Sequence, residues 1–172
     1  VYMSSIKRLF DFPYYQLENY NLEKSLVSKK EGKWIATSTQ EYIDKANAIS
    51  RGLIQLGIQP NDKVAIISMT NRTEWNICDI GILQTGAQDV PIYPTITAAD
   101  YKFILNNAEV KIIFVANEEL YAKVKEIIHE VDTKPEIYSF DNVEGVKKWN
   151  ELLEAGKKGS LEELENIKNS IK

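Results

Sequence analysis

Val64-Ala65-Ile66-Ile67-Ser68-Met69 is the stretch that decides the fold, because it is an almost unbroken apolar run of strand length. A strand of this kind is covered on both faces, which is typical of a parallel sheet layered by helices. A helix is predicted directly before it. Ser38 and Glu41 have capping-box spacing there, and apolar residues then recur at helical spacing up to Gly57. A helix followed at once by a buried strand predicts an α/β unit.

The same alternation continues along the chain to residue 156. Further strands are predicted at 89–92, 111–115 and 136–140, and further helices at 71–85, 97–107, 117–131 and 146–155. Asn71, Thr97 and Asn117 are the predicted helix caps, and Gly156 is the predicted end of the last helix. Pro91 cannot donate a hydrogen bond to a neighbouring strand, so its strand is expected at a sheet edge or at a strand end. These elements and their short links predict an α/β fold with a layered, mostly parallel sheet flanked by helices.

Two further parts flank this core. Strand-like runs on either side of Lys30-Glu31-Gly32 predict a β-hairpin. We therefore divide the chain into a lead-in expected to be irregular, a hairpin, an α/β core and a tail, at residues 1–24, 25–37, 38–156 and 157–172. The tail carries an amphipathic stripe without a visible partner, which predicts exposed apolar surface and self-association. Its members are Leu161, Leu164, Ile167 and Ile171.

Composition excludes several classes of protein. Of the 172 residues, 44% are hydrophobic and 27% are charged, as in a globular domain. The net charge of −4 and the scattered lysines argue against a nucleic-acid partner. No apolar run reaches the roughly 20 residues that span a bilayer, and the opening residues 1–5 do not resemble a secretory signal. Cys78 is the only cysteine, which excludes an internal disulfide and favours a cytoplasmic location.

Ligands of an open α/β sheet bind beyond the carboxyl ends of its strands. In this chain those ends are Thr70-Asn71-Arg72, Tyr93-Pro94-Thr95, Ala116-Asn117 and Asp141-Asn142. None of them carries an acid–base pair or a nucleophile beside a base. His129 is the only histidine and lies late in a predicted helix, so a histidine metal cluster is excluded. We therefore predict no catalytic residue and no metal site from these segments.

Phosphate binding needs bunched backbone N–H groups, usually from a glycine-rich loop. The eight glycines of this chain are dispersed. Gly81 and Gly86 have the spacing of a P-loop, but Ala87-Gln88 stands where lysine and serine or threonine are needed. Cys78 shares an apolar helix face and is predicted to be buried rather than nucleophilic. The residues alone thus indicate an α/β domain without a visible active site.

A resemblance extends this interpretation. Residues 38–42, 51–66, 71–75 and 84–95 together resemble the adenylate-forming, AMP-binding superfamily, and the likeness covers about residues 5–155. Within it, Val90 to Thr95 and Lys147 to Leu153 are most similar to long-chain fatty acyl-CoA synthetases. Asn61 stands where most relatives have glycine. Asparagine is the best substitute at a positive φ angle, so we expect the turn there to be kept.

The resemblance implies that residues 1–172 are the N-terminal portion of a large AMP-binding domain. The longer protein would use ATP and magnesium to convert a long-chain fatty acid into an acyl-adenylate, and would then transfer the acyl group to CoA. The resemblance places the phosphate loop and the catalytic residues of such enzymes downstream of this chain. We therefore expect the fragment itself to be inactive and to bind no cofactor. Tyr93, Pro94 and Thr95 are the candidate site residues, which the resemblance puts near the CoA entrance.

Two alternatives remain open at this point. The longer protein could adenylate another carboxylate, such as an aryl or amino acid, because the substrate pocket of the superfamily also lies downstream. The chain could instead be a non-catalytic, stand-alone α/β interaction module. For the longer protein, the resemblance is compatible with fatty acid, ATP and CoA as partners and with peripheral contact with a membrane.

Overall fold

The structure is a computed structural model, which describes residues 6–172. The opening residues, which carry the prediction about a secretory signal, lie outside that range. Within residues 6–172, the sheet has five strands in the order β4-β3-β5-β6-β7, and every neighbouring pair is parallel. The strands are β3 (Lys63–Ile67), β4 (Gln88–Ile92), β5 (Val110–Val115), β6 (Glu136–Ser139) and β7 (Lys147–Lys148). The predicted α/β fold with a parallel sheet is confirmed.

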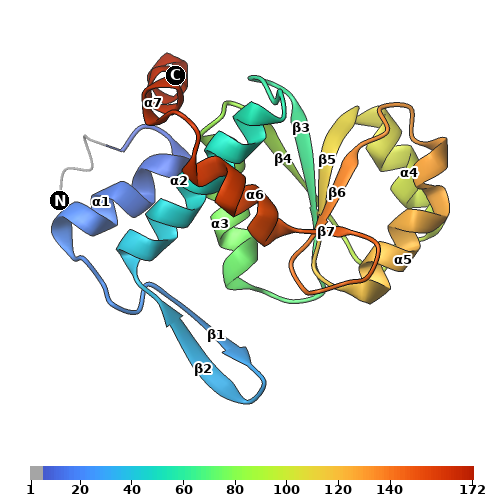
Figure 1. Cartoon of the computed structure of the whole chain (residues 1–172), viewed down its shortest axis with the longest axis horizontal. Coiled ribbons are helices and arrows are strands. Elements are labelled where there is room, and N and C mark those ends of the chain that lie inside the picture. Colours follow the sequence, from blue (N-terminus) through green and yellow to red (C-terminus); the bar gives the residue numbers. More distant parts are fainter. Residues whose placement is uncertain (1–5) are drawn as a thin grey trace.

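Helices cover both faces of this sheet, as Figure 1 shows. On one side lie α2 (Thr39–Gln55), α3 (Thr73–Leu83) and α6 (Trp149–Lys157), and on the other lie α4 (Ala98–Asn107) and α5 (Glu118–Ile127). A short 3₁₀ turn, η2 (Ile128–Glu130), follows α5. The predicted caps form at three of these helices: Ser38, Thr97 and Asn117 each accept a hydrogen bond from the backbone N–H three residues on. These bonds satisfy donors that would otherwise be free, and they fix where each helix begins.

The core is centred on β3, as the opening stretch predicts. Val64 to Ile67 are buried, and Ile67 lies opposite Val115 of the neighbouring strand β5. Cys78 of α3 is also fully buried, as predicted. Strand β4, which contains Pro91, lies at the edge of the sheet, so the missing N–H group breaks no interior pairing.

The loop before β3 also agrees with expectation. Asn61 has a φ angle of 70°, so it adopts the left-handed conformation in which asparagine replaces glycine at the least cost. Its backbone N–H donates to the carbonyl of Gly86, 2.8 Å away. Gly86 itself has a φ angle of 75° and follows the end of α3. A glycine is therefore needed there for the turn after the helix and not for a phosphate loop.

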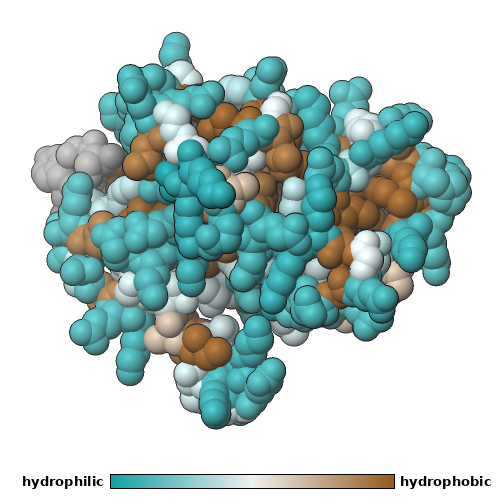
Figure 2. Space-filling view, viewed as in Figure 1, coloured by the Kyte–Doolittle hydropathy of each residue, from teal (hydrophilic) through white to brown (hydrophobic). Residues whose placement is uncertain are grey.

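The predicted hairpin is confirmed and consists of β1 (Leu26–Lys30) and β2 (Lys33–Thr37) in antiparallel pairing. Glu31 and Gly32 have φ angles of 50° and 79°, and two positive values in succession define the tight turn that suits twisted strands. The hairpin leaves the start of α2 and projects away from the helices and the sheet (Figure 1). Figure 2 shows hydrophobic surface on it, surrounded by hydrophilic side chains.

Three predicted helix boundaries are wrong. Asn71 does not cap α3. The cap position is Arg72, whose side chain is engaged with carboxylates and makes no capping bond. The helix predicted at 146–155 begins only at Trp149, because Lys147–Lys148 pairs with β6 as strand β7. Gly156 does not end that helix but lies inside it, where an added Cβ would be 1.8 Å from the Ala48 carbonyl oxygen. Its role is therefore the close approach of α6 to α2.

The two flanking parts are more ordered than expected. The lead-in contains a 3₁₀ turn, η1 (Leu9–Asp11), and helix α1 (Phe12–Asn19), so its predicted irregularity is wrong. The tail forms α7 (Leu161–Ser170). Leu164 is fully buried while Leu161 is 54% exposed, so the tail stripe has a partner along part of its length. Among residues 6–172, no helix has the length and apolar character needed to cross a membrane.

Candidate functional site

A groove with a volume of about 1050 Å³ lies beyond the carboxyl ends of β3 and β4. Thr70-Asn71-Arg72 forms one wall and Tyr93-Pro94-Thr95 the other. Trp75 and Asn76 from the first turn of α3 complete the lining on one side. The structure thus brings together two of the four strand-end segments selected from the sequence, at the edge where ligands of such sheets bind.

The other two segments lie along the same edge. Asp141 and Asn142, which follow β6, line a second cavity of about 740 Å³ together with Arg72 and residues of the hairpin. Thr73 donates from its hydroxyl to Ser28 of β1 over 3.3 Å, which ties the hairpin to the start of α3. Asn117 is used locally, because its side chain accepts from the backbone N–H of Leu120 as the cap of α5.

Arg72 joins these strand ends. Its Nη2 atom donates to Glu74 Oε1 over 2.9 Å and to Asp141 Oδ1 over 2.8 Å. Its Nη1 atom donates to the carbonyl of Ala116, the residue after β5, over 3.2 Å. The guanidinium also lies 5.6 Å from the ring centroid of Phe140. One side chain therefore holds the ends of β3, β5 and β6 in fixed relation, as the planar fork of arginine allows.

The charges in this cluster stabilise one another. Burial opposes the ionisation of Glu74, but the hydrogen bonds and positive charge of Arg72 outweigh burial and hold the pKa of Glu74 below its ordinary value. Burial likewise opposes the charge of Arg72, and the carboxylates of Asp141 and Glu74 reverse that effect and raise its pKa. Arg72 is thereby committed to its two carboxylate partners, and its chemistry in this structure is that of a clamp.

The predicted site residues Tyr93, Pro94 and Thr95 form a loop whose backbone carbonyls accept hydrogen bonds from α4 and α5. The carbonyl of Tyr93 accepts from the Tyr101 hydroxyl over 3.2 Å, and the carbonyl of Pro94 accepts from Lys123 Nζ over 3.1 Å. The Tyr93 side chain itself is 79% exposed. The loop is thus anchored through its backbone while its aromatic ring stays accessible beside the groove. Its assignment to a CoA entrance remains a prediction.

The groove offers no catalytic group of its own. Within residues 6–172, no set of three or more histidine, cysteine, aspartate or glutamate side chains could hold a metal ion. His129 is 70% exposed on the turn after α5, where it lies 3.8 Å from Glu130. Burial and the charges of Glu74 and Asp79 raise the pKa of the Cys78 thiol well above its ordinary value, so this cysteine is a core residue.

Sequence reasoning missed one titratable pair. Burial, followed by the nearby Asp89 carboxylate, raises the pKa of Asp79 to about 7. Asp79 lies on α3 and Asp89 on the edge strand β4, and both are half-buried. No spacing rule connects a helix residue with the following strand, so only the fold brings these carboxyl groups together. The pair lies outside the groove lining.

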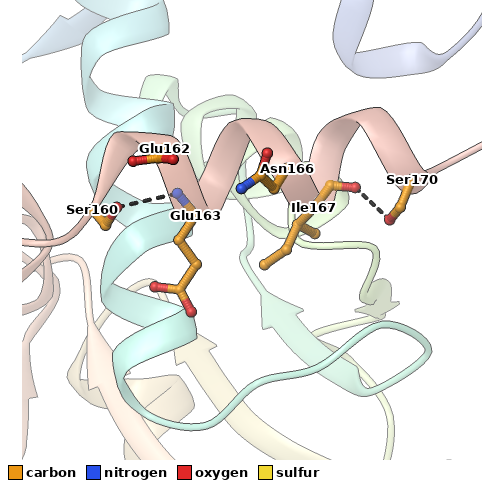
Figure 3. Close-up of a pocket in the computed structure, with 6 residues that line it drawn as sticks. All are labelled: Ser160, Glu162, Glu163, Asn166, Ile167 and Ser170. Carbon is orange, nitrogen blue, oxygen red and sulfur yellow. Dashed lines mark hydrogen bonds between the residues drawn. The ribbon is translucent and has the colours of Figure 1, made fainter.

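Figure 3 shows the residues that line a third depression, of about 460 Å³, along α7. The Ser160 hydroxyl accepts from the backbone N–H of Glu163 over 3.1 Å, and the Ser170 hydroxyl donates to the Ile167 carbonyl over 2.6 Å. Both hydroxyls therefore serve the ends of the helix itself, and we assign this depression no function.

Comparison with known proteins gives one family and several relatives. The AMP-binding enzyme family matches residues 16–169. Long-chain-fatty-acid--CoA ligase FadD15 of Mycobacterium bovis is 33% identical over 126 residues, which is 73% of this chain and 21% of that protein. Long-chain-fatty-acid--CoA ligase ACSBG2 of Xenopus laevis is 27% identical over 153 residues, which is 86% of this chain and 21% of that protein. The chain thus spans about a fifth of the length of these curated relatives.

Solved structures agree with the fold. The anthranilate CoA ligase AuaEII in complex with anthranoyl-AMP superposes with a TM-score of 0.76 at 18% identity, over 88% of this chain and 29% of that one. A benzoate CoA ligase from Burkholderia xenovorans LB400 gives a TM-score of 0.70 at 14% identity, over 87% and 29%. At such identities the likeness supports the fold alone. The five-stranded sheet of residues 6–172, with its flanking helices, is the fold that these ligases share with this chain.

Proposed function

Because the chain belongs to the AMP-binding enzyme family, we propose that it is the N-terminal portion of an ATP-dependent acyl-CoA ligase. The observation that carries this proposal is the family match over residues 16–169, which includes every strand of the sheet and every helix from α2 to α6. A ligase of this kind activates a carboxylate as an acyl-adenylate and transfers the acyl group to the thiol of CoA. The domain limits at 1–24, 25–37, 38–156 and 157–172 are part of the same proposal.

We further propose that the carboxylate is a long-chain fatty acid. Support comes from the names of two relatives, since FadD15 at 33% identity and ACSBG2 at 27% identity are both named long-chain-fatty-acid--CoA ligases. The runner-up is an aryl acid, because ligases for anthranilate and benzoate share the fold. Their identities of 18% and 14% are lower, which favours the fatty acid.

Tyr93, Pro94 and Thr95 are proposed to line the approach of CoA. The loop lies at the carboxyl edge of the sheet, where α/β proteins bind ligands. Tyr101 and Lys123 anchor its carbonyls, so its position does not depend on the exposed Tyr93 ring. A rigid loop with an accessible aromatic side chain is suited to guide a long, flexible ligand.

ATP and magnesium are proposed for the longer protein and not for these residues. Among residues 6–172, no carboxylate set fits a magnesium ion, and no bunched glycines fit a triphosphate. We therefore assign no step of ATP chemistry to this chain and propose that it is inactive by itself. A cytoplasmic location is also proposed, with the lone, buried Cys78 as its support.

The test is carboxylate-dependent exchange of pyrophosphate into ATP. It should be run on this chain and on the full-length protein, with acetate, octanoate, palmitate, benzoate and amino acids as substrates. Full-length protein should exchange best with palmitate, and the 172-residue chain should not exchange with any of them. Exchange by the chain alone would contradict its proposed inactivity. A preference of the full-length protein for benzoate would remove the long-chain assignment and leave the family unaffected.

A further inference from the structure

The β1–β2 hairpin concentrates positive charge in an otherwise acidic chain. Residues 24–34 contain four lysines and one glutamate, whereas the chain as a whole has a net charge of −4. The lysines are Lys24, Lys29, Lys30 and Lys33, and all four are exposed. Among residues 6–172, none of these four lysines forms an ion pair. The lysines that do form ion pairs lie on the core helices and strands and on α7. Lys30 acts through its charge on Glu74, but within the described chain no lysine of the hairpin is held in an ion pair, so this charge can meet a partner.

The same hairpin exposes large apolar side chains. Trp34 is 72% exposed, Val27 is 49% exposed and Ile35 is 47% exposed. The register pairs Lys29 with Trp34 and Val27 with Ala36, so these four side chains share one face of the ribbon. The Lys29 ammonium lies 5.8 Å from the centroid of the Trp34 ring. A tryptophan and aliphatic residues interleaved with lysines are typical of surfaces that lie at the boundary between lipid headgroups and acyl chains.

The position of the hairpin makes this surface accessible. It projects from the start of α2, with Ser28 of β1 bonded to the start of α3 and the turn pointing away from the sheet (Figure 1), and its apolar surface is visible from outside (Figure 2). Lysines on free strand edges often serve only to prevent edge-to-edge pairing. That role does not account for an exposed tryptophan beside them, since exposed apolar side chains favour the association that lysines prevent.

We propose that the β1–β2 hairpin is a docking surface for an anionic lipid bilayer. Trp34 and Val27 enter the headgroup region with Lys29 on the same face, and Lys30 and Lys33, which flank the turn on the other face, bind lipid phosphates at the tip of the hairpin. A nucleic acid would leave the exposed Val27 without an apolar partner, so the bilayer fits both the apolar and the basic side chains of the hairpin better. The proposal is independent of the ligase function, because it concerns neither the groove nor its loop.

Charge complementarity sets the size of the effect. A lysine near an anionic membrane surface increases partitioning by about fivefold, so three lysines together contribute about 100-fold. Such attraction acts within about 10 Å at 0.1 M salt and weakens as salt is added. Binding should therefore depend on the content of anionic lipid and on ionic strength.

The test is sedimentation of the 172-residue chain with lipid vesicles. Neutral vesicles consist of phosphatidylcholine, anionic vesicles also contain about 30 mol % phosphatidylglycerol, and each is measured at about 0.05 and 0.3 M salt. The chain should bind the anionic vesicles at low salt and much less at high salt or on neutral vesicles. The triple variant Lys29→Gln, Lys30→Gln, Lys33→Gln should bind about 100-fold more weakly. A matched variant, Lys45→Gln, Lys125→Gln, Lys158→Gln, changes three exposed lysines elsewhere and should bind like the original chain.

A second readout is tryptophan fluorescence. Of the three tryptophans, Trp149 is buried and Trp75 is partly buried, whereas Trp34 is exposed. Transfer of Trp34 into the interface should therefore shift its part of the fluorescence emission to shorter wavelength, with Trp34→Phe as the control that removes the shift. Lipids brominated on their acyl chains should quench that emission. Equal binding of the two triple variants, or binding without a spectral shift, contradicts the proposal. Failure to bind vesicles, combined with hairpin-dependent self-association or binding to a single-stranded oligonucleotide, would assign the surface to a second copy or to nucleic acid instead.

Discussion

Strand β3, with the sequence Lys63-Val64-Ala65-Ile66-Ile67, and strand β2, with the sequence Lys33-Trp34-Ile35-Ala36-Thr37, have equal length and similar composition. Their burial is opposite. In β3 every residue after Lys63 is buried, whereas in β2 only Thr37 is buried. β3 has a parallel neighbour on each side and helices over both faces, while β2 has a single antiparallel partner. Residue type thus determines that a strand forms, and its neighbours determine whether that strand stabilises the fold or remains available for contact.

The largest expected effect comes from the same substitution placed in each strand. Ile66→Ala should lower the free energy of unfolding by about 2–5 kcal/mol, because it leaves a cavity beside β5. Ile35→Ala is the matched control and should cost less than about 0.5 kcal/mol, since Ile35 is 47% exposed. Urea unfolding followed by circular dichroism measures both. Similar losses of unfolding free energy for the two variants would show that the hairpin contributes to the core. They would contradict the difference between β3 and β2.

Arg72 lies between these two regions and tests how firmly the strand ends are joined. Arg72→Ala should lower the free energy of unfolding by about 2–3 kcal/mol, because it leaves the carboxylates of Glu74 and Asp141 without their partner at a partly buried site. Arg51→Ala is the control, since Arg51 donates only to backbone carbonyls, and should cost less than about 1 kcal/mol. Equal losses in urea unfolding would mean that Arg72 is not a clamp.

The smallest expected effect concerns β4, whose burial is intermediate between that of β3 and β2. Burial and the Asp89 carboxylate raise the pKa of Asp79 to about 7, so the folded state favours the protonated acid. The stability that this protonation gives is complete below the ordinary pKa of 3.8 and is lost as the pH rises through about 7. Between pH 5 and 8, the free energy of unfolding should therefore fall with rising pH.

Asp79→Asn should remove much of this slope, because an amide does not titrate. Asp44→Asn changes an exposed aspartate of α2 and should leave the slope unchanged. Thermal unfolding at closely spaced pH values measures both variants. If stability depends on pH in the same way for the original chain and for Asp79→Asn, the two carboxyl groups do not share a proton. The edge strand β4 would then be as well solvated as the hairpin.

Much of the fold could be predicted because its signals are local. A cap such as Ser38 with Glu41, or the Glu31-Gly32 turn, is complete within a few residues. Helix α1 has no such signal, because its apolar residues do not form one buried stripe, and the sequence favours Asn71 as a cap because it does not show how Arg72 is engaged.

The candidate site also has one part that local sequence signals predict and another that they do not. The groove could be located from the rule that ligands bind at strand ends, and Tyr93-Pro94-Thr95 lines it as that rule implies. The bond from Arg72 to Asp141 joins positions 69 residues apart, and no spacing in the sequence indicates it. The contact between Asp79 and Asp89 likewise depends on how α3 lies against the edge strand. Such contacts follow from packing, which a single sequence specifies only through the whole fold.

The guanidinium of Arg8 donates to the backbone carbonyls of Lys168 and Ile171 at the end of α7. Arg8 precedes these partners by 160 residues or more, so it is synthesised well before its acceptors. At about 5–20 residues per second, a ribosome needs about 8–32 s to cover that distance. Throughout that interval η1 and α1 must wait without α7, although the strands between them are already available to pair. The contact between the lead-in and α7 can therefore form only after residue 171 has been made, and until then the nascent lead-in is exposed on the side that α7 later covers.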